Sequence, residues 1–248
     1  MKEITSVQNS VYKLIKSLKT KKFRKEKGLY TVEGVKSVKD ALDADCDIYL
    51  IAVSDRLEES FDFENVYRIP DRIFSPLCDT DSPQGVIAVI KIPEMHKKIP
   101  EKKLCLYCDR VSDPGNIGTI IRICDAVDAA LVLSHGCADI YSPKTVRASM
   151  GSFFHTDIAY DAGYELLKDM KKSGYRILAG ALGGEPADYR DEIYSDKNVI
   201  VVGNEANGIS EEIYGICDHT VKIPIFGKAE SLNVAVAAAL MLYKAKEK

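Results

Sequence analysis

The sequence predicts an α/β protein with a small N-terminal α/β domain and a larger C-terminal domain built on an open parallel sheet. In the second half, near-continuous apolar runs alternate with helical patterns, as expected for strands buried on both faces of a parallel sheet. Between the halves, Lys91–Lys103 reads KIPEMHKKIPEKK, a polar and basic stretch with two prolines, and prolines interrupt regular structure. We therefore predict domains at 1–92 and 104–248, joined by a linker at 93–103.

The N-terminal domain is predicted to begin with a helix over residues 7–19, because Val7, Val11, Leu14 and Leu18 recur at helical spacing. Shorter segments follow, in which strand and helix patterns alternate. They are a strand at 29–34, a helix at 35–44, and buried strands at 47–54 and 85–91.

The C-terminal domain has the more regular alternation. A helix over 115–127 follows its first strand, and a helix over 231–246, rich in alanine and free of glycine and proline, ends it. In an open parallel sheet, ligands bind at the carboxyl ends of the strands, so the loops at those ends are the candidate sites. The predicted strands are 104–109, 130–134, 175–182, 198–204 and 219–225.

Charge is unevenly distributed along the chain. The net charge of −3 argues by itself against a nucleic-acid partner, but Val11–Lys27 holds eight basic residues and one acid. Such a run is either a solvated helix face or a surface that binds phosphates. The basic residues are Lys13, Lys16, Lys19, Lys21, Lys22, Arg24, Lys25 and Lys27.

The seven cysteines are an odd number, and the first 22 residues contain no apolar stretch of the signal-peptide type. We therefore expect free thiols and a cytoplasmic location. Cys105 and Cys108 form a C-x-x-C within a predicted strand, without a second pair, so we expect no metal site. The longest apolar run, Val234–Tyr243, is about half of a membrane span.

The first unusual loop leaves the strand at 104–109. Pro114 and Gly115 predict a turn, after which Asn116 is placed to cap the helix. Arg122 follows among isoleucines, where its planar guanidinium is suited to hold a phosphate or a carboxylate. The alternative is an ordinary capped loop with a surface arginine.

The second loop, Val202–Ser210, has glycines at 203 and 208 that permit backbone conformations closed to other residues. It presents Glu205 just beyond an apolar strand. The alternative is a tight turn with a solvated glutamate.

The third loop, Ile223–Asn233, leads into the C-terminal helix. Ser231 is placed to cap that helix, and Asn233 follows on its first turn. The chain lacks G-x-G-x-x-G after its first C-terminal strand, and it lacks G-x-x-x-x-G-K-[ST] and G-x-S-x-G. Dinucleotide, ATP and esterase chemistry therefore lose support.

Taken together, these loops resemble the signatures of the SpoU (TrmH-like) RNA 2′-O-ribose methyltransferase family of the SPOUT superfamily. DPGNIGTIIR resembles the first signature, VVGNEANGIS the second and IPIFGKAESLNVAVAAAL the third, while SPKTVRASMGSFFH resembles a further shared stretch. NSVYKLIKSL, YTVEG and SPQGV resemble the substrate-binding domain of rRNA-directed members. The resemblance covers nearly the whole chain.

The resemblance implies a SPOUT domain with a trefoil knot, a homodimer, and S-adenosyl-L-methionine as cofactor. It places the cofactor against Gly203, Ile223 and Leu232, near Leu182. It implies methylation of a ribose hydroxyl in structured RNA, with Arg122 at the reacting group. Because arginine almost never deprotonates in proteins, we expect Arg122 to grip the flanking phosphate and to stabilise the developing alkoxide, while either that phosphate or Glu205 takes the proton. The catalytic and substrate-contacting positions that it implies are Asn116, Arg122, Glu205, Ser231 and Asn233.

The basic run then becomes an RNA-binding face of the N-terminal domain. rRNA is favoured over tRNA by the appended N-terminal domain. Two alternatives stay open, namely a tRNA ribose methyltransferase and a non-catalytic RNA-binding or ribosome-assembly factor; a nucleotide-dependent oxidoreductase lacks its glycine fingerprint. The residues assigned to RNA binding are Lys21, Lys22, Arg24, Lys25 and Arg147.

Overall fold

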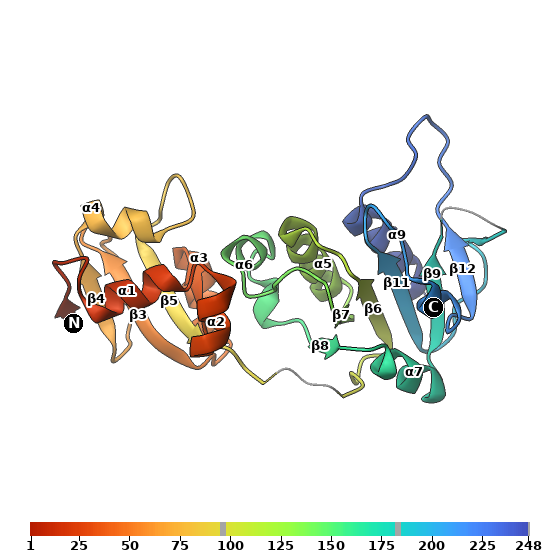
Figure 1. Ribbon diagram of the computed structural model, residues 1–248, viewed down its shortest axis with the longest axis horizontal. Helices are drawn as coiled ribbons and strands as arrows, with labels where there is room; N and C mark the ends of the chain where they lie inside the picture. The colour runs from red at the N-terminus through yellow and green to blue at the C-terminus, as the bar shows by residue number, and fades with distance from the viewer. Residues whose placement is uncertain (95–97, 182–184, 248) are drawn as a thin grey trace. The chain divides into compact units, whose positions relative to one another are not determined.

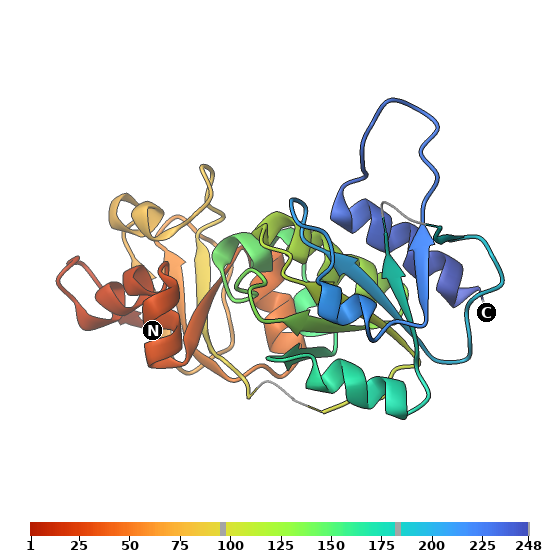
Figure 2. The same cartoon turned by 45° about the vertical axis from the view of Figure 1, so that its right-hand side comes forward.

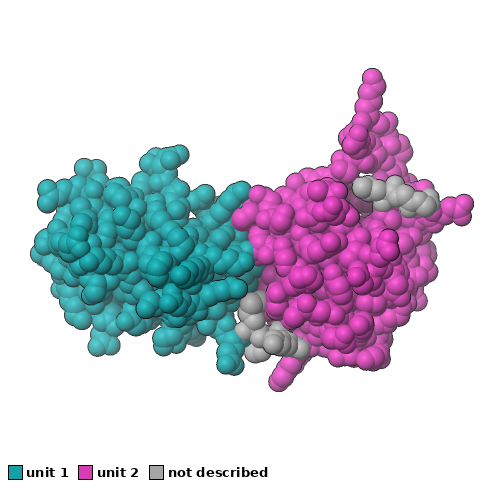
Figure 3. All heavy atoms as spheres, in the orientation of Figure 1, with its two compact units in different colours: residues 1–94, 139–154 teal, residues 95–138, 155–248 magenta. Residues whose placement is uncertain are grey.

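The computed structural model describes residues 1–94, 98–181 and 185–247. These residues form two compact units (Figure 3). Unit 1 consists of residues 1–94 together with 139–154, and unit 2 contains the remaining described residues. The segment 139–154, which the predicted boundaries assign to the C-terminal domain, thus packs with the N-terminal residues.

Unit 1 is built on a mixed sheet, which in the described residues has five strands in the order β1-β4-β3-β5-β2. β3 and β4 run parallel, whereas β5 is antiparallel to both β3 and β2. The predicted strands and helix at 29–34, 35–44, 47–54 and 85–91 are present. The strands are β1 (Lys2–Glu3), β2 (Leu29–Glu33), β3 (Ile48–Ser54), β4 (Val66–Ile69) and β5 (Val86–Lys91).

Helices cover the sheet of unit 1 (Figure 1). The first helix begins after Asn9, whose side chain accepts a hydrogen bond from the Val11 amide at 2.8 Å, and it buries Tyr12 and Ile15 in the core of the unit. The helices are α1 (Ser10–Ser17), α2 (Lys21–Lys27), α3 (Val35–Asp43), α4 (Asp71–Phe74) and α6 (Pro143–Ala148), with 3-10 turns η1 (Ser75–Leu77) and η2 (Ser152–Phe154).

The segment 139–154 is held in unit 1 by an ion pair and by aromatic contacts. The Arg24 guanidinium lies 2.7 Å from an Asp139 carboxylate oxygen and is 4% exposed. The Tyr30 ring contacts those of Tyr141 and Phe153, with centroids 5.0 and 5.9 Å away. Residues far apart in the sequence therefore share one core.

Unit 2 is built on a sheet that, in the described residues, has seven strands in the order β10-β12-β9-β11-β6-β7-β8. Every pair in it is parallel. The predicted parallel sheet is confirmed. Its strands are β6 (Leu104–Asp109), β7 (Ala130–Ser134), β8 (Ile158–Asp161), β9 (Arg176–Gly180), β10 (Ala187–Asp188), β11 (Asn198–Gly203) and β12 (His219–Lys222).

Helices lie on both faces of this sheet (Figure 2). Leu167 and Met170 of α7 pack into the core cluster on one face, while α9 packs against α5, β6 and β11. No helix of residues 1–94, 98–181 and 185–247 is long and apolar enough to cross a bilayer. The helices are α5 (Pro114–Ala126), α7 (Glu165–Lys172), α8 (Glu211–Tyr214) and α9 (Val234–Lys246).

The order of the strands reverses beside β6. β6 has β7 on one side and β11 on the other, and the final residues of β6 and β11, Asp109 and Gly203, are register partners. Such a switch point is where open parallel sheets bind ligands. The first two unusual loops therefore leave the sheet side by side.

Candidate active site

The first loop leads into α5, whose start differs from the prediction. The Asp113 carboxylate accepts a hydrogen bond from the Asn116 amide at 2.9 Å, and Pro114 opens the helix. Asp113 is thus the N-cap, and the prediction of Asn116 as the cap is wrong. Because proline at the first helical position needs no amide partner, this start is favoured. The Asn116 carboxamide is left to make other contacts.

That carboxamide joins the three loops. Asn116 Nδ2 donates to Glu205 Oε1 at 2.6 Å, and Asn233 Nδ2 donates to Asn116 Oδ1 at 3.0 Å. We call this hydrogen-bonded chain of Glu205, Asn116 and Asn233 the amide relay. It brings together three of the five residues predicted to be catalytic or substrate-contacting.

The relay is anchored at the start of α9. Asn233 Oδ1 accepts from the Ala235 amide at 2.9 Å, so Asn233 is the N-cap of this helix. The prediction that Ser231 caps the helix is wrong, since Ser231 is exposed and lies two residues before the cap. Because one face of its carboxamide is fixed by the helix, Asn233 holds Asn116 in a defined orientation.

The second loop is closed by a pair of backbone hydrogen bonds. The Asn204 amide donates to Gly208 O at 3.0 Å, and the Gly208 amide donates to Asn204 O at 2.8 Å. A Cβ on Gly203 would lie 2.3 Å from the carbonyl carbon of Gly208, and Gly208 itself has φ +64°. Both predicted glycines are therefore required by the turn that presents Glu205.

Gly203→Ala is expected to destabilise this turn by about 1–3 kcal/mol, as overpacking of a filled site does. The thermal midpoint should fall by roughly 2–4 °C per kcal/mol for a chain of this size. The matched control is Gly227→Ala, because nothing lies within 4 Å of a Cβ built there. Equal melting temperatures for the two variants, measured by calorimetry, would show that the turn has room for a side chain.

The buried carboxylate of Asp109, at the start of the first loop, also holds the second loop. Asp109 is 0% exposed, and it accepts hydrogen bonds from the Ser210 amide at 2.8 Å and from Tyr164 Oη at 3.3 Å. Its ion pair with Arg110 measures 3.1 Å. Asn204 Nδ2 donates to Arg110 O at 2.9 Å, so the Asp109 carboxylate and the Arg110 backbone together hold the second loop at two points.

The neighbours of Asp109 have unusual backbone and electrostatics. Arg110 and Tyr164 adopt left-handed backbone, with φ of 55° and 64°, which is uncommon for residues other than glycine and clusters at functional sites. Burial raises the pKa of Tyr164, and the hydrogen bond to Asp109 raises the pKa of Arg110. No role was predicted for Asp109, although an aspartate at the end of an apolar strand is a usable signal.

In the third loop, the backbone is largely unpaired with the part of the chain that the structure describes. The backbone groups of residues 223–232 make no hydrogen bond with the described part of the chain. In both ribbon views this loop extends away from the sheet before α9 returns to it (Figures 1 and 2). Ile223 is half-buried and Leu232 is 38% exposed. Leu182, the fourth predicted cofactor contact, lies outside the described residues.

Arg122 and Ser231 do not join the relay. Both side chains are exposed, and neither forms a hydrogen bond or an ion pair with the described residues. Arg122 lies six residues beyond Asn116, about 9 Å further along the helix axis. Its guanidinium is therefore available for an anionic ligand.

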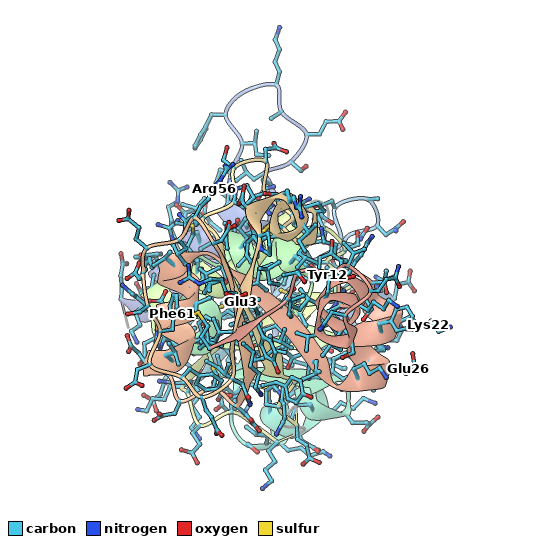
Figure 4. All side chains as sticks on the ribbon, turned by 90° about the vertical axis from the view of Figure 1, so that its left-hand side faces the viewer. Glu3, Tyr12, Lys22, Glu26, Arg56 and Phe61 are labelled. Atoms are coloured by element: carbon cyan, nitrogen blue, oxygen red, sulfur yellow. The ribbon has the colours of Figure 1, made fainter. Side chains whose placement is uncertain are left out.

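The predicted basic face is largely exposed. Lys21, Lys22 and Lys25 on α2 are solvent-accessible, and Lys22 extends outward in Figure 4. Arg147 is exposed too, with one guanidinium nitrogen 3.5 Å from Asp79 O.

The prediction that Arg24 belongs to this RNA-binding face is wrong. Its Nη1 donates to Leu18 O and Lys19 O at 2.7 and 2.9 Å, and its other nitrogens bind Asp139. A buried guanidinium whose donors are already used does not contact RNA. Arg24 instead fastens segment 139–154.

The cysteines of β6 are buried, and burial raises the pKa of the Cys105 thiol to about 12. Burial likewise raises the pKa of the Cys108 thiol. Within residues 1–94, 98–181 and 185–247, no three His, Cys, Asp or Glu side chains are grouped to hold a metal ion.

Family models match both parts of the chain. Residues 103–243 match the SpoU rRNA Methylase family, and residues 9–88 match the MRM3-like substrate binding domain. The chain is 35% identical over 248 residues to the 23S rRNA (guanosine(2553)-2′-O)-methyltransferase RlmP of Bacillus subtilis, with 98% of each chain covered.

Two solved structures are similar over nearly the whole length. One is an AdoMet-bound rRNA methyltransferase from Sinorhizobium meliloti, 32% identical with a TM-score of 0.89, covering 99% of this chain and 97% of that one. The other is the SpoU methyltransferase AviRb from Streptomyces viridochromogenes in complex with AdoMet, 28% identical with a TM-score of 0.86, covering 96% and 97%.

Proposed function

Since the chain belongs to the SpoU rRNA methylase family, we propose that it methylates one ribose 2′-hydroxyl of ribosomal RNA through the site at the ends of β6, β11 and β12. The chain is an RNA ribose methyltransferase that uses S-adenosylmethionine. The observation that carries the assignment of the site is the amide relay, because it joins all three signature loops at the switch point of the sheet.

The third loop fits the cofactor. When bound, S-adenosylmethionine supplies an electrophilic methyl group on a sulfonium centre. Amides and carbonyls over 223–232 that have no partner among the described residues are suited to hold its polar groups, and Gly203 lets the backbone approach closely. We propose that Gly203, Ile223 and Leu232 line this site.

The side chains of the three loops and of α5 orient the ribose and remove its proton. Glu205 Oε1 is occupied by Asn116, while Glu205 Oε2 has no partner in the described part of the chain. We propose that Oε2 takes the proton of the 2′-hydroxyl, and that Ser231 helps to orient the ribose. Arg122 grips the flanking phosphate and stabilises the developing oxyanion as a fixed cation, because arginine does not deprotonate in proteins.

The test is methyl transfer from radiolabelled S-adenosylmethionine to unmodified total RNA, separated into rRNA and tRNA and mapped for 2′-O-methylation. We expect label at one ribose in rRNA. Label confined to tRNA would overturn the choice of RNA. No label in any RNA, with cofactor binding intact, would favour a non-catalytic assembly factor.

We also propose that the chain forms a homodimer and is located in the cytoplasm. We further propose that its C-terminal segment forms a trefoil knot. Val236, Leu240 and Tyr243 are 49%, 37% and 56% exposed and recur at helical spacing on α9, so they form an apolar stripe that a second copy would cover. Free thiols at all seven cysteines suit a reducing compartment. Sedimentation of the purified chain tests the dimer.

Charge reversal of Lys21 and Lys25 is expected to weaken RNA binding about tenfold at physiological salt, because each phosphate contact contributes through counterion release. The matched control reverses Lys168 and Lys172, an exposed pair with the same spacing on α7. Binding is measured by filter retention at several salt concentrations. Equal losses in both variants would mean that α2 is an ordinary solvated face.

A further inference from the structure

An open groove lies on unit 1, outside the candidate active site. It runs between α1 and the sheet, is lined among others by Val11, Leu14, Tyr49, Asn65 and Tyr67, and has a volume of about 340 Å³. That volume lies at the lower end of the range for small-molecule sites.

Tyr49 is directed into this groove by an irregularity of the sheet. The other six residues of β3 are buried, whereas Tyr49 is 47% exposed. The register between β3 and β5 shifts between Ile48 and Leu50, on either side of Tyr49. Such bulges re-aim single side chains and recur near functional sites.

The polar side chains that line the groove have no hydrogen-bond partner among the described residues. The side-chain polar atoms of Tyr49, Asn65 and Tyr67 make no hydrogen bond with the described residues. The Asn65 carboxamide therefore keeps two donors and one acceptor for a ligand. Lys2 adds a cation at the Tyr67 ring, with its Nζ 5.5 Å from the ring centroid.

We propose that this groove binds an unstacked nucleobase of single-stranded RNA. Tyr49 stacks on the base, Asn65 reads its polar edge, and Lys2 meets the adjoining phosphate. Aromatic rings with free amides and nearby cations are the chemistry by which proteins bind splayed-out bases. The proposal rests on the proposed function, since it assigns part of the RNA substrate to a second contact away from the reacting ribose.

The test compares Tyr49→Ala, Tyr49→Leu and Tyr49→Phe in the full-length chain. The probe is a single-stranded RNA oligomer carrying 2-aminopurine, whose fluorescence is quenched by stacking. We expect Tyr49→Phe to retain the quenching and Tyr49→Ala and Tyr49→Leu to lose it, with a roughly 5- to 150-fold loss of affinity. Asn65→Ala should weaken binding while retaining part of the quenching.

Kinetics separate this proposal from the proposed function. Because Tyr49 does not touch the reacting atoms, Tyr49→Ala should raise KM for rRNA and leave kcat unchanged at saturating RNA. If Tyr49→Ala still methylates rRNA with unchanged RNA affinity and unchanged KM, the groove is not an RNA site. A protein partner would then be the alternative occupant of the groove. Failure of the unaltered chain to methylate any RNA would instead overturn the proposed function.

Discussion

Arg122→Ala is expected to lower the rate of methyl transfer roughly 10²- to 10³-fold, as removal of one preorganised hydrogen-bond donor at a developing oxyanion does. The affinity for S-adenosylmethionine should be unchanged, because Arg122 lies on α5 and the residues assigned to the cofactor lie on the second and third loops. The rate is measured in single turnover with rRNA, and cofactor affinity by calorimetry.

Stability separates a loss of chemistry from a loss of fold. Arg122 is exposed and contacts no described residue by a hydrogen bond or an ion pair, so its removal should change stability by no more than about 0.5 kcal/mol. Arg122→Lys is the conservative control. It keeps the charge but not the planar fork that pairs with a phosphate, so an intermediate rate is expected. Near-normal turnover in Arg122→Ala would remove Arg122 from the mechanism.

The parallel sheet could be predicted because its central strands are buried on both faces. Five of the six residues of β11 are buried, as are all residues of β6 and β7, and unbroken apolar runs are their signature. β8 was missed because it has four residues and alternates between half-buried and buried. Short edge strands with mixed exposure carry too little periodicity to identify.

The helix caps show the limit of local rules. The sequence D-P-G-N offers two good capping residues, and the structure uses Asp113 rather than Asn116. The third loop offers Ser231 and Asn233, and it uses Asn233. Capping preferences of serine, aspartate and asparagine are nearly equal, so they do not decide between the candidates. Pro114 at the first helical position favours Asp113, whereas no such local signal separates Ser231 from Asn233.

Hydrogen bonds between residues far apart in the chain could not be predicted from the sequence. Asn116 meets Glu205 and Asn233 across separations of 89 and 117 residues. The three signatures predicted a common site. They did not predict which of these side chains donate and which accept hydrogen bonds, because that depends on how the sheet brings the three loops together. Arg24 is the opposite case, since it was assigned to an exposed face by its basic neighbours. Its partner Asp139 is 115 residues away, and no local pattern marks such a pairing.

Asp109→Ala is expected to destabilise the protein by about 1–3 kcal/mol, because it leaves buried hydrogen-bond donors without an acceptor, while Arg110, which is 33% exposed, can turn to water. The Ser210 amide, the Tyr164 hydroxyl and the Arg110 guanidinium would all lose an acceptor. Asp109→Asn keeps an oxygen for Ser210 but no charge for Arg110, so an intermediate loss is expected. Urea denaturation of the full chain gives the free energies of unfolding.

The control is Asp188→Ala, which breaks another aspartate–arginine pair. The Asp188–Arg190 pair is shorter, at 2.6 Å against 3.1 Å, but its arginine is 58% exposed. Exposed ion pairs contribute little because water screens them, so this variant should resemble the unaltered chain. If both variants lost the same stability, burial of Asp109 would not be the cause. Asp109→Ala should also weaken cofactor binding, because the bond from the Ser210 amide to Asp109 fixes the second loop, and that loop carries Gly203, one of the residues assigned to the cofactor.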